Sequence, residues 1–201
     1  MKQWIAGLML SGFLACALAQ APAGEVVRIR GTVQSLEGNV LTVRTRAGDA
    51  ARVRLADNAV VMGLAKASIA DVTSGKFVGT TTIGERDGAL IAHEIHIFPE
   101  NMRGTGEGHR DWDLRPNSKM TNANVADIRS VGKDRVMSVT YKGGEKKVLI
   151  PDNAVVVAYE PADRSELKPG APVFVNAQKG ADGALAASRV NVGLRGQIPP
   201  M

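Results

Sequence analysis

The chain has 201 residues, of which 25 are Lys or Arg, 20 are Asp or Glu and 3 are His, so its formal net charge is +5 at pH 7. This excess of positive charge is too small to indicate a specific nucleic-acid partner by itself. The 22 Gly residues and the low aromatic content of 4% are typical of a turn-rich β protein with small cores.

The N-terminus has the order of a secretory signal peptide. Lys2 precedes an apolar run at 4–14, and the small residues Ala17-Leu18-Ala19 stand before Gln20. The sequence therefore predicts a signal peptide at 1–19 and a periplasmic or secreted protein. The apolar run is too short to span about 30 Å of hydrocarbon, and no later segment predicts a transmembrane helix in the mature chain.

Cys16 is the only cysteine, and it lies before the predicted cleavage site. The mature chain is therefore expected to contain no thiol and no disulfide. A lipoprotein acylated at Cys16 is the alternative interpretation. Phe13 disfavours it, because it is a poor residue three positions before such a cysteine.

An internal repeat predicts the domain organisation. Residues 52–97 align with 147–192 at a constant offset of 95 and without a gap, with 14 identities in 46 positions. Both copies contain the segments DNAVV and DGAL. The alignment predicts two domains of one design. The expected boundaries are a first repeat at 20–97, an inter-repeat polar loop at 98–123 and a second repeat at 124–201.

Alternation of apolar and polar residues predicts three half-buried strands in the first repeat, near 27–33, 41–43 and 53–55. A short helix is expected next in each copy, because Ser68 and Asp163 are each followed three residues later by an acid. Two more strands should follow it. This order predicts an all-β fold with two tandem OB-like five-stranded barrels, each with a short helix between strands three and four. A small open sandwich would give the same pattern.

The DNAVV segments, the DGAL turns and the linking segment FPENMRGTGEGHRDWDLRPNSKMTNA resemble a known family. Its members are bacterial exported proteins with tandem OB-like repeats, labelled as a domain of unknown function. The resemblance implies the fold and export, and it implies no activity.

The inter-repeat loop at 98–123 is too long for an ordinary hairpin connection, and its composition is not that of a flexible linker. It is interpreted either as a structural clamp, held between the two barrels by Trp112 and by internal ion pairs, or as a ligand site. The candidate ligand-binding residues are Arg103, Arg110, Asp111, Trp112 and Asp113.

The three histidines lie in or near this loop. On a strand, a spacing of three sends His93 and His96 to opposite faces. His93 shares its face with isoleucines and is interpreted as a core-edge histidine. His96 shares its face with Glu94, and the repeat places Arg189 and Asn191 at these two positions, so this face is expected to be solvated in both copies.

A metal site is the sharper hypothesis for these residues. A divalent ion would be held by Glu94, His96, Glu107 and His109, with Asp111 or Asp113 as a further ligand. These residue types suit such an ion, but their spacing matches no established signature, and the alternative is a solvated cluster without metal.

Six arginines occupy the polar phase of the first three strands and are expected to share one outer face: Arg28, Arg30, Arg44, Arg46, Arg52 and Arg54. This face is a candidate for binding an anionic polymer or another envelope component. It lacks the aromatic platform of single-strand binders, and a merely solvated face is the alternative.

The sequence thus favours a non-enzymatic binding or scaffolding module of the cell envelope. Two alternatives stay open, namely a metal-dependent site at the inter-repeat loop, which could be enzymatic, and a purely structural component.

Overall fold

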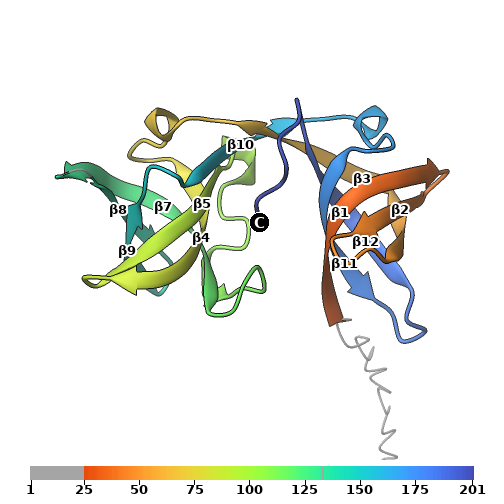
Figure 1. The fold of residues 1–201 in the computed structure, drawn as a ribbon, viewed down its shortest axis with the longest axis horizontal. Helices are drawn as coiled ribbons and strands as arrows, with labels where there is room; N and C mark the ends of the chain where they lie inside the picture. The colour runs from red at the N-terminus through yellow and green to blue at the C-terminus, as the bar shows by residue number, and fades with distance from the viewer. Residues whose placement is uncertain (1–24, 133) are drawn as a thin grey trace, which may run out of the picture.

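A computed structural model describes residues 25–132 and 134–201, so the predicted signal peptide lies outside the described residues. The secondary structure is strand except for short 3₁₀ turns, which confirms the all-β prediction. Among the described residues, no helix is both long and apolar enough to cross a membrane. The strands form two lobes, and the C-terminal segment enters the space between them (Figure 1).

The first lobe is a closed ring of five strands, called here the first ring. Four of its pairs are antiparallel, namely β1 with β2, β2 with β3, β11 with β12, and β1 with β11, while β12 pairs with β3 in parallel. Its strands are β1 (Glu25–Glu37), β2 (Val40–Thr45), β3 (Ala50–Lys66), β11 (Pro172–Lys179) and β12 (Leu185–Gly193).

The second lobe has the same pattern of pairings and is called the second ring. β7 pairs with β4 and β8, β4 with β5, β8 with β9, and β5 closes the ring against β9 in parallel. Its strands are β4 (Phe77–Arg86), β5 (Ala89–Ile97), β7 (Ser118–Val131), β8 (Asp134–Tyr141) and β9 (Gly144–Ile150).

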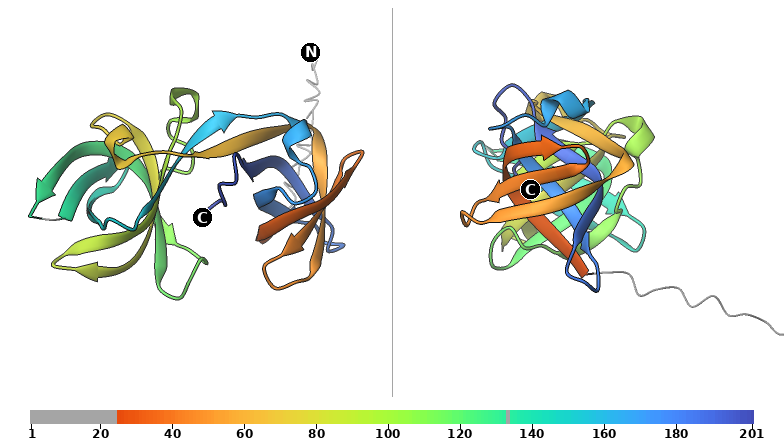
Figure 2. Two further views of the ribbon diagram at one scale, coloured as in Figure 1. Left: turned by 45° about the horizontal axis from the view of Figure 1, so that its top comes forward. Right: turned by 90° about the vertical axis from the view of Figure 1, so that its right-hand side faces the viewer.

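The rings exchange strands, which differs from the expectation of one contiguous repeat per barrel. Each ring takes three strands from one half of the chain and two from the other. The long strand β3 does not turn back after the DNAVV segment but continues to Lys66 and carries the chain to the second ring. β10 (Val155–Pro161) returns beside it, antiparallel from Lys66↔Val157 to Met62↔Pro161 (Figure 2).

Each ring has its own apolar core, built by inward side chains that alternate along the strands. Leu41, Val43 and Val53 are fully buried in the first ring. Ile95, Met137 and Val139 have the same role in the second. The period-two alternation of the sequence therefore marks the residues that fill these rings.

Single 3₁₀ turns stand where short helices were expected, at η1 (Ile69–Asp71) and η3 (Arg164–Glu166). Ser68 and Asp71 form the expected capping box, whereas Asp163 makes no side-chain cap. The inter-repeat loop contains η2 (Glu100–Met102) and the short strand β6 (Gly108–Asp111), which pairs with β7. Because β7 begins at Ser118, the loop ends earlier than the expected residue 123.

Candidate functional site

The two rings face each other across a cleft, whose floor is a continuous stretch of sheet. In pairing order, β12, β3, β10 and β5 run from the first ring to the second. Asn191 pairs with Met62, Tyr159 with Leu64, and His96 with Val157. Since paired residues share a face of a sheet, polar and aromatic side chains from both rings rise on the same side.

A β-bulge in β5 sets the direction of the histidines. Thr81 pairs with Glu94 and Thr82 with Ala92, so His93 is the extra residue of the bulge. Ala92 and Ile95 both reach the core of the second ring, while His93 is only half-buried. His93 therefore stands outside the regular alternation on which its expected position rested.

Glu94 and His96 are buried, at 0% and 3% exposure. Their expected solvated face is instead covered, because the outer surface of the second ring packs toward the first ring and the inter-repeat loop. A Cβ atom on Gly79 would lie 1.8 Å from His96 Nε2, so only glycine at this position lets the imidazole lie against β4.

The buried Glu94 carboxylate is only half satisfied. Its Oε1 accepts a 2.6 Å hydrogen bond from the Thr81 hydroxyl and lies 3.4 Å from His96 Nδ1, while Oε2 has no partner among the described residues. Burial raises the pKa of the Tyr159 hydroxyl, and the negative charge of Glu94 raises it further. Tyr159 is therefore a hydrogen-bond donor in the cleft at neutral pH.

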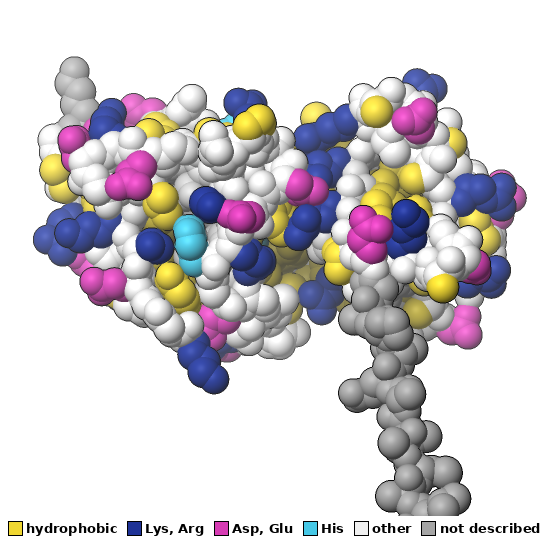
Figure 3. All heavy atoms as spheres, turned by 90° about the horizontal axis from the view of Figure 1, so that it is seen from below, with side chains coloured by type: hydrophobic (Ala, Val, Ile, Leu, Met, Phe, Trp, Pro, Cys, Tyr) yellow, Lys and Arg dark blue, Asp and Glu magenta, His cyan; other side chains and the backbone are white. Residues whose placement is uncertain are grey.

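The cleft encloses a cavity of about 200 Å³. Aromatic rings form part of its wall, with Phe98 stacked on Tyr159 at a centroid distance of 5.0 Å, and Trp112 tilted toward Phe174. No described Asp or Glu is among the lining residues. Besides the aromatic residues, the polar and cationic side chains that line it are His96, Thr105, Arg110, Asn122, Asn176, Arg189 and Asn191. Figure 3 shows Lys and Arg side chains gathered along the hollow between the lobes.

Four buried polar atoms of the lining residues have no hydrogen-bond partner among the described residues. They are His96 Nδ1, Trp112 Nε1, Asn122 Oδ1 and Asn191 Oδ1. A buried donor or acceptor left unpaired costs about 1–3 kcal/mol. These atoms are shielded from solvent, so they mark a polar wall but are not themselves open to a molecule in the cavity.

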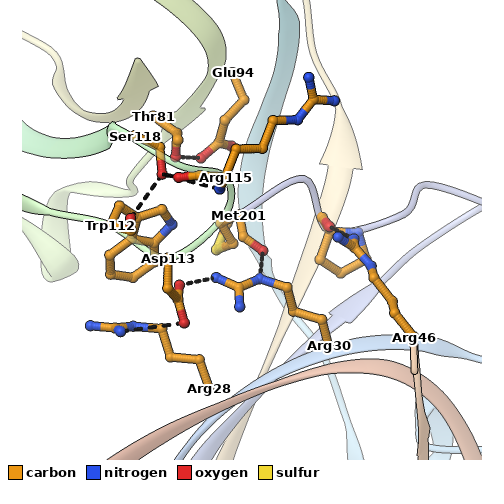
Figure 4. A network of polar contacts seen from close by, with 11 residues as sticks. Arg28, Arg30, Arg46, Thr81, Glu94, Trp112, Asp113, Arg115, Ser118 and Met201 are labelled. Atoms are coloured by element: carbon orange, nitrogen blue, oxygen red, sulfur yellow. Dashed lines mark hydrogen bonds and ion pairs between the residues drawn. The ribbon is translucent and has the colours of Figure 1, made fainter. Parts of the chain in front are cut away.

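Trp112 and Asp113 clamp the inter-repeat loop onto the first ring (Figure 4). The Arg28 guanidinium lies 4.2 Å from the centroid of the Trp112 ring, and Arg30 Nη2 donates a 2.6 Å hydrogen bond to Asp113. Burial opposes ionisation of Asp113, but the hydrogen bond from Arg30 and the charges of Arg30 and Arg28 outweigh it, so its pKa is lowered. Asp113 thus pairs with arginines of β1, whereas the clamp interpretation expected ion pairs within the loop.

The C-terminal segment closes one side of the cleft. Met201 is 2% exposed and packs with Leu64, Met120 and Phe174. Its main-chain oxygen accepts a 2.7 Å hydrogen bond from Arg30 Nε (Figure 4). The segment therefore joins both rings at the cleft.

The candidate metal ligands do not converge. His109 Nδ1 lies 2.8 Å from the Thr121 hydroxyl. Thr121 and Asn122 are successive residues of β7, so their side chains point to opposite faces of the sheet. Asn122 lines the cleft with His96, and His109 therefore lies on the opposite face of β7 from His96. Glu107 accepts a hydrogen bond from the Lys142 main chain. Within residues 25–132 and 134–201, no group of three His, Cys, Asp or Glu side chains could hold a metal ion.

The other loop candidates have separate places. Arg103 pairs with Glu100 and donates to the carbonyl oxygen of Gly75, and Asp111 pairs with Lys119 at the surface. Arg110 lines the cleft and donates to the Gly106 carbonyl oxygen, and burial, followed by the charge of Arg28, lowers its pKa. Of the proposed ligand-binding set, only Arg110 and Trp112 line the cavity.

The predicted arginine face is divided. Arg28 and Arg30 turn to the clamp, and Arg46 Nη2 donates to the Pro199 carbonyl oxygen. The remaining three are exposed on β2 and β3 and make no ion pair with the described residues: Arg44, Arg52 and Arg54.

Sequence reasoning missed Tyr159, Asn122 and Asn191 as site residues. One signal was available, because the repeat aligns Glu94 with Arg189 and His96 with Asn191. The structure brings His96, Arg189 and Asn191 together across the cleft. Two outward faces that look solvated in isolated barrels face each other once the rings exchange strands.

No protein-family model matches the sequence, and the comparisons with curated proteins and with solved structures gave no match.

Proposed function

We propose that this chain is an exported, non-enzymatic binding module whose ligand occupies the cleft between the rings. The observation that carries the proposal is the cavity between the rings, which is lined by aromatic, amide and cationic side chains from both of them. Ligand sites combine apolar and aromatic walls with a few polar groups that fix the orientation of the ligand.

The architecture supports this proposal. We infer that each ring is an OB-like barrel, because three antiparallel strands are followed around the ring by a parallel partner of the third. Small barrels of this kind bind ligands on the outer face of the sheet. Here two such faces meet, so one ligand contacts both rings. Export is supported by the N-terminal sequence pattern at 1–19.

Trp112 provides the readout for a test, because the other tryptophan of the chain, Trp4, lies in the predicted signal peptide. The mature protein would be titrated with a panel of neutral sugars, sugar acids, amino acids, short peptides and nucleotides while Trp112 emission is recorded. We expect a saturable change with at least one class.

Two variants locate that change. Asn191→Leu removes an amide group of the cleft lining at similar side-chain volume and should abolish the response. Asn58→Leu, at an exposed position away from the cleft lining, is the matched control and should keep it. If no class changes the emission, or if Asn191→Leu responds like the wild type, the proposal is wrong.

A further inference from the structure

We infer that the ligand of the cleft is a sugar acid, a single polyhydroxylated ring of hexuronate size that carries one carboxylate. This inference rests on the proposed function and names the ligand class for the same site. It follows from the charge, the hydrogen-bonding groups and the size of the cavity.

The charge of the lining selects an anion. Arg110 and Arg189 both line the cavity, and neither has an ion-pair partner among the described residues. Arg28 and Arg30 lie behind Trp112, where Asp113 provides one negative charge for the two of them. Asp113 and the buried Glu94 beside His96 offset part of this positive charge. A guanidinium binds a carboxylate through two parallel hydrogen bonds, so a carboxylate would offset the positive charge that remains.

The amide side chains of the lining favour more than an anion. Asn122, Asn176 and Asn191 line the cavity, and each amide offers an accepting oxygen beside its donating nitrogen, so a ligand with both donors and acceptors suits them. A simple carboxylate or a phosphate dianion has no donor to offer. An amino acid would donate through its ammonium group, which the neighbouring guanidinium groups repel. Hydroxyl groups donate without adding positive charge, so they fit both requirements.

The size and the walls favour one ring. A cavity of about 200 Å³ between the rings has room for a single sugar ring. Phe98 and Tyr159 stack in nearly parallel planes, 17° apart, beside the polar groups. Aromatic faces carry partial negative charge and attract the C–H groups of a sugar ring.

Calorimetric titration of the mature protein with four probes tests the ligand class. Glucuronate is expected to bind. Glucose has the same ring without the carboxylate, acetate has the carboxylate without the hydroxyls, and inorganic phosphate is a bare oxyanion. Each of these three should bind at least roughly tenfold more weakly than glucuronate.

Two arginine variants test the role of the charge. Arg189→Gln should weaken glucuronate binding about tenfold, whereas Arg52→Gln, an equal change of net charge on the outer surface, should not. Circular dichroism melting would show that both variants are folded.

The remaining outcomes overturn the inference in distinguishable ways. If glucose binds as well as glucuronate, the site takes a neutral sugar, and if acetate or phosphate binds as well, it is a plain oxyanion site. In both cases the proposed binding function stands. If none of the four probes binds, the sugar-acid class is wrong. The Trp112 panel then decides whether the cleft binds another class or whether the proposed function fails as well.

Discussion

His109 couples the stability of the second ring to pH. Its Nδ1 lies 2.8 Å from the Thr121 hydroxyl, and its ring stacks over Tyr141. Burial lowers its pKa, and the positive charges of Lys146 and Lys119 lower it further. The folded state therefore favours the neutral imidazole.

This shift makes a prediction about unfolding. As pH falls below about 6.5, the unfolded chain takes up a proton at His109 before the folded protein does, so stability decreases as pH falls toward the lowered folded-state pKa. His109→Gln should make the melting temperature fall less steeply between about pH 7 and pH 5 than it does in the wild type. Identical slopes for both proteins would show that His109 does not titrate as described.

The sequence predicts the role of Trp112 but not the surroundings of Glu94 and His96. Trp112 was expected as an anchor because a lone aromatic in a polar loop has a large area to bury. The burial of Glu94 and His96 could not be foreseen, since alternation along β5 shows only that they share a face. The first ring and the inter-repeat loop cover that face, and neither is visible in the alternation of β5.

The inter-repeat loop is the element whose energetics are clearest. Trp112 contacts Arg28 of β1 across the cleft and lies near Phe174 of β11, so one side chain joins the loop to the first ring. Its main-chain N–H donates to the Ser118 carbonyl oxygen, and the Ser118 hydroxyl donates to the Trp112 carbonyl oxygen, which fixes the loop where β7 begins.

Trp112→Ala should therefore lower the free energy of unfolding by about 2–3 kcal/mol, less than for a fully buried tryptophan because the indole is half-buried. Chemical denaturation would measure this loss. Asp111→Ala, one residue away, is the control and should have little effect, since Asp111 pairs with Lys119 at the surface. Equal stabilities for Trp112→Ala and the wild type would exclude a clamp.

The positions of most elements could be predicted from the sequence. Alternation along β1, β2 and β3 marks the inward residues directly, and Ser68 with Asp71 marks the turn at η1. The bulge at His93 could not be predicted from the sequence, because an extra residue in β5 leaves no local signal in a run of apolar residues.

For the whole molecule, strand exchange makes the two halves of the chain interdependent. Neither half of the chain contains all five strands of one ring. The first ring needs β11 and β12 from the second half, and the second ring needs β4 and β5 from the first half. The sequence could predict which strands exist but not which copy they join. Repeated segments offer equivalent pairing surfaces in both copies.

A protease site introduced between Gly104 and Thr105 tests this arrangement. After cleavage, we expect the two fragments to stay together in gel filtration and to melt as one complex, with a melting temperature that rises with protein concentration. The uncleaved protein is the control, and its melting temperature should not depend on concentration. Fragments that elute separately as folded monomers would show that each repeat forms its own barrel.

The exchange also sets when this chain can fold. Glu25, in the first strand, pairs with Lys179, and β3 needs β12, which ends at Gly193, so a chain made from its N-terminus cannot complete the first ring until nearly all of it exists. Such a high contact order makes folding slow. For a chain exported as proposed, the delay has a use: the polypeptide is still unfolded during synthesis, in the state that can thread through a narrow translocation channel.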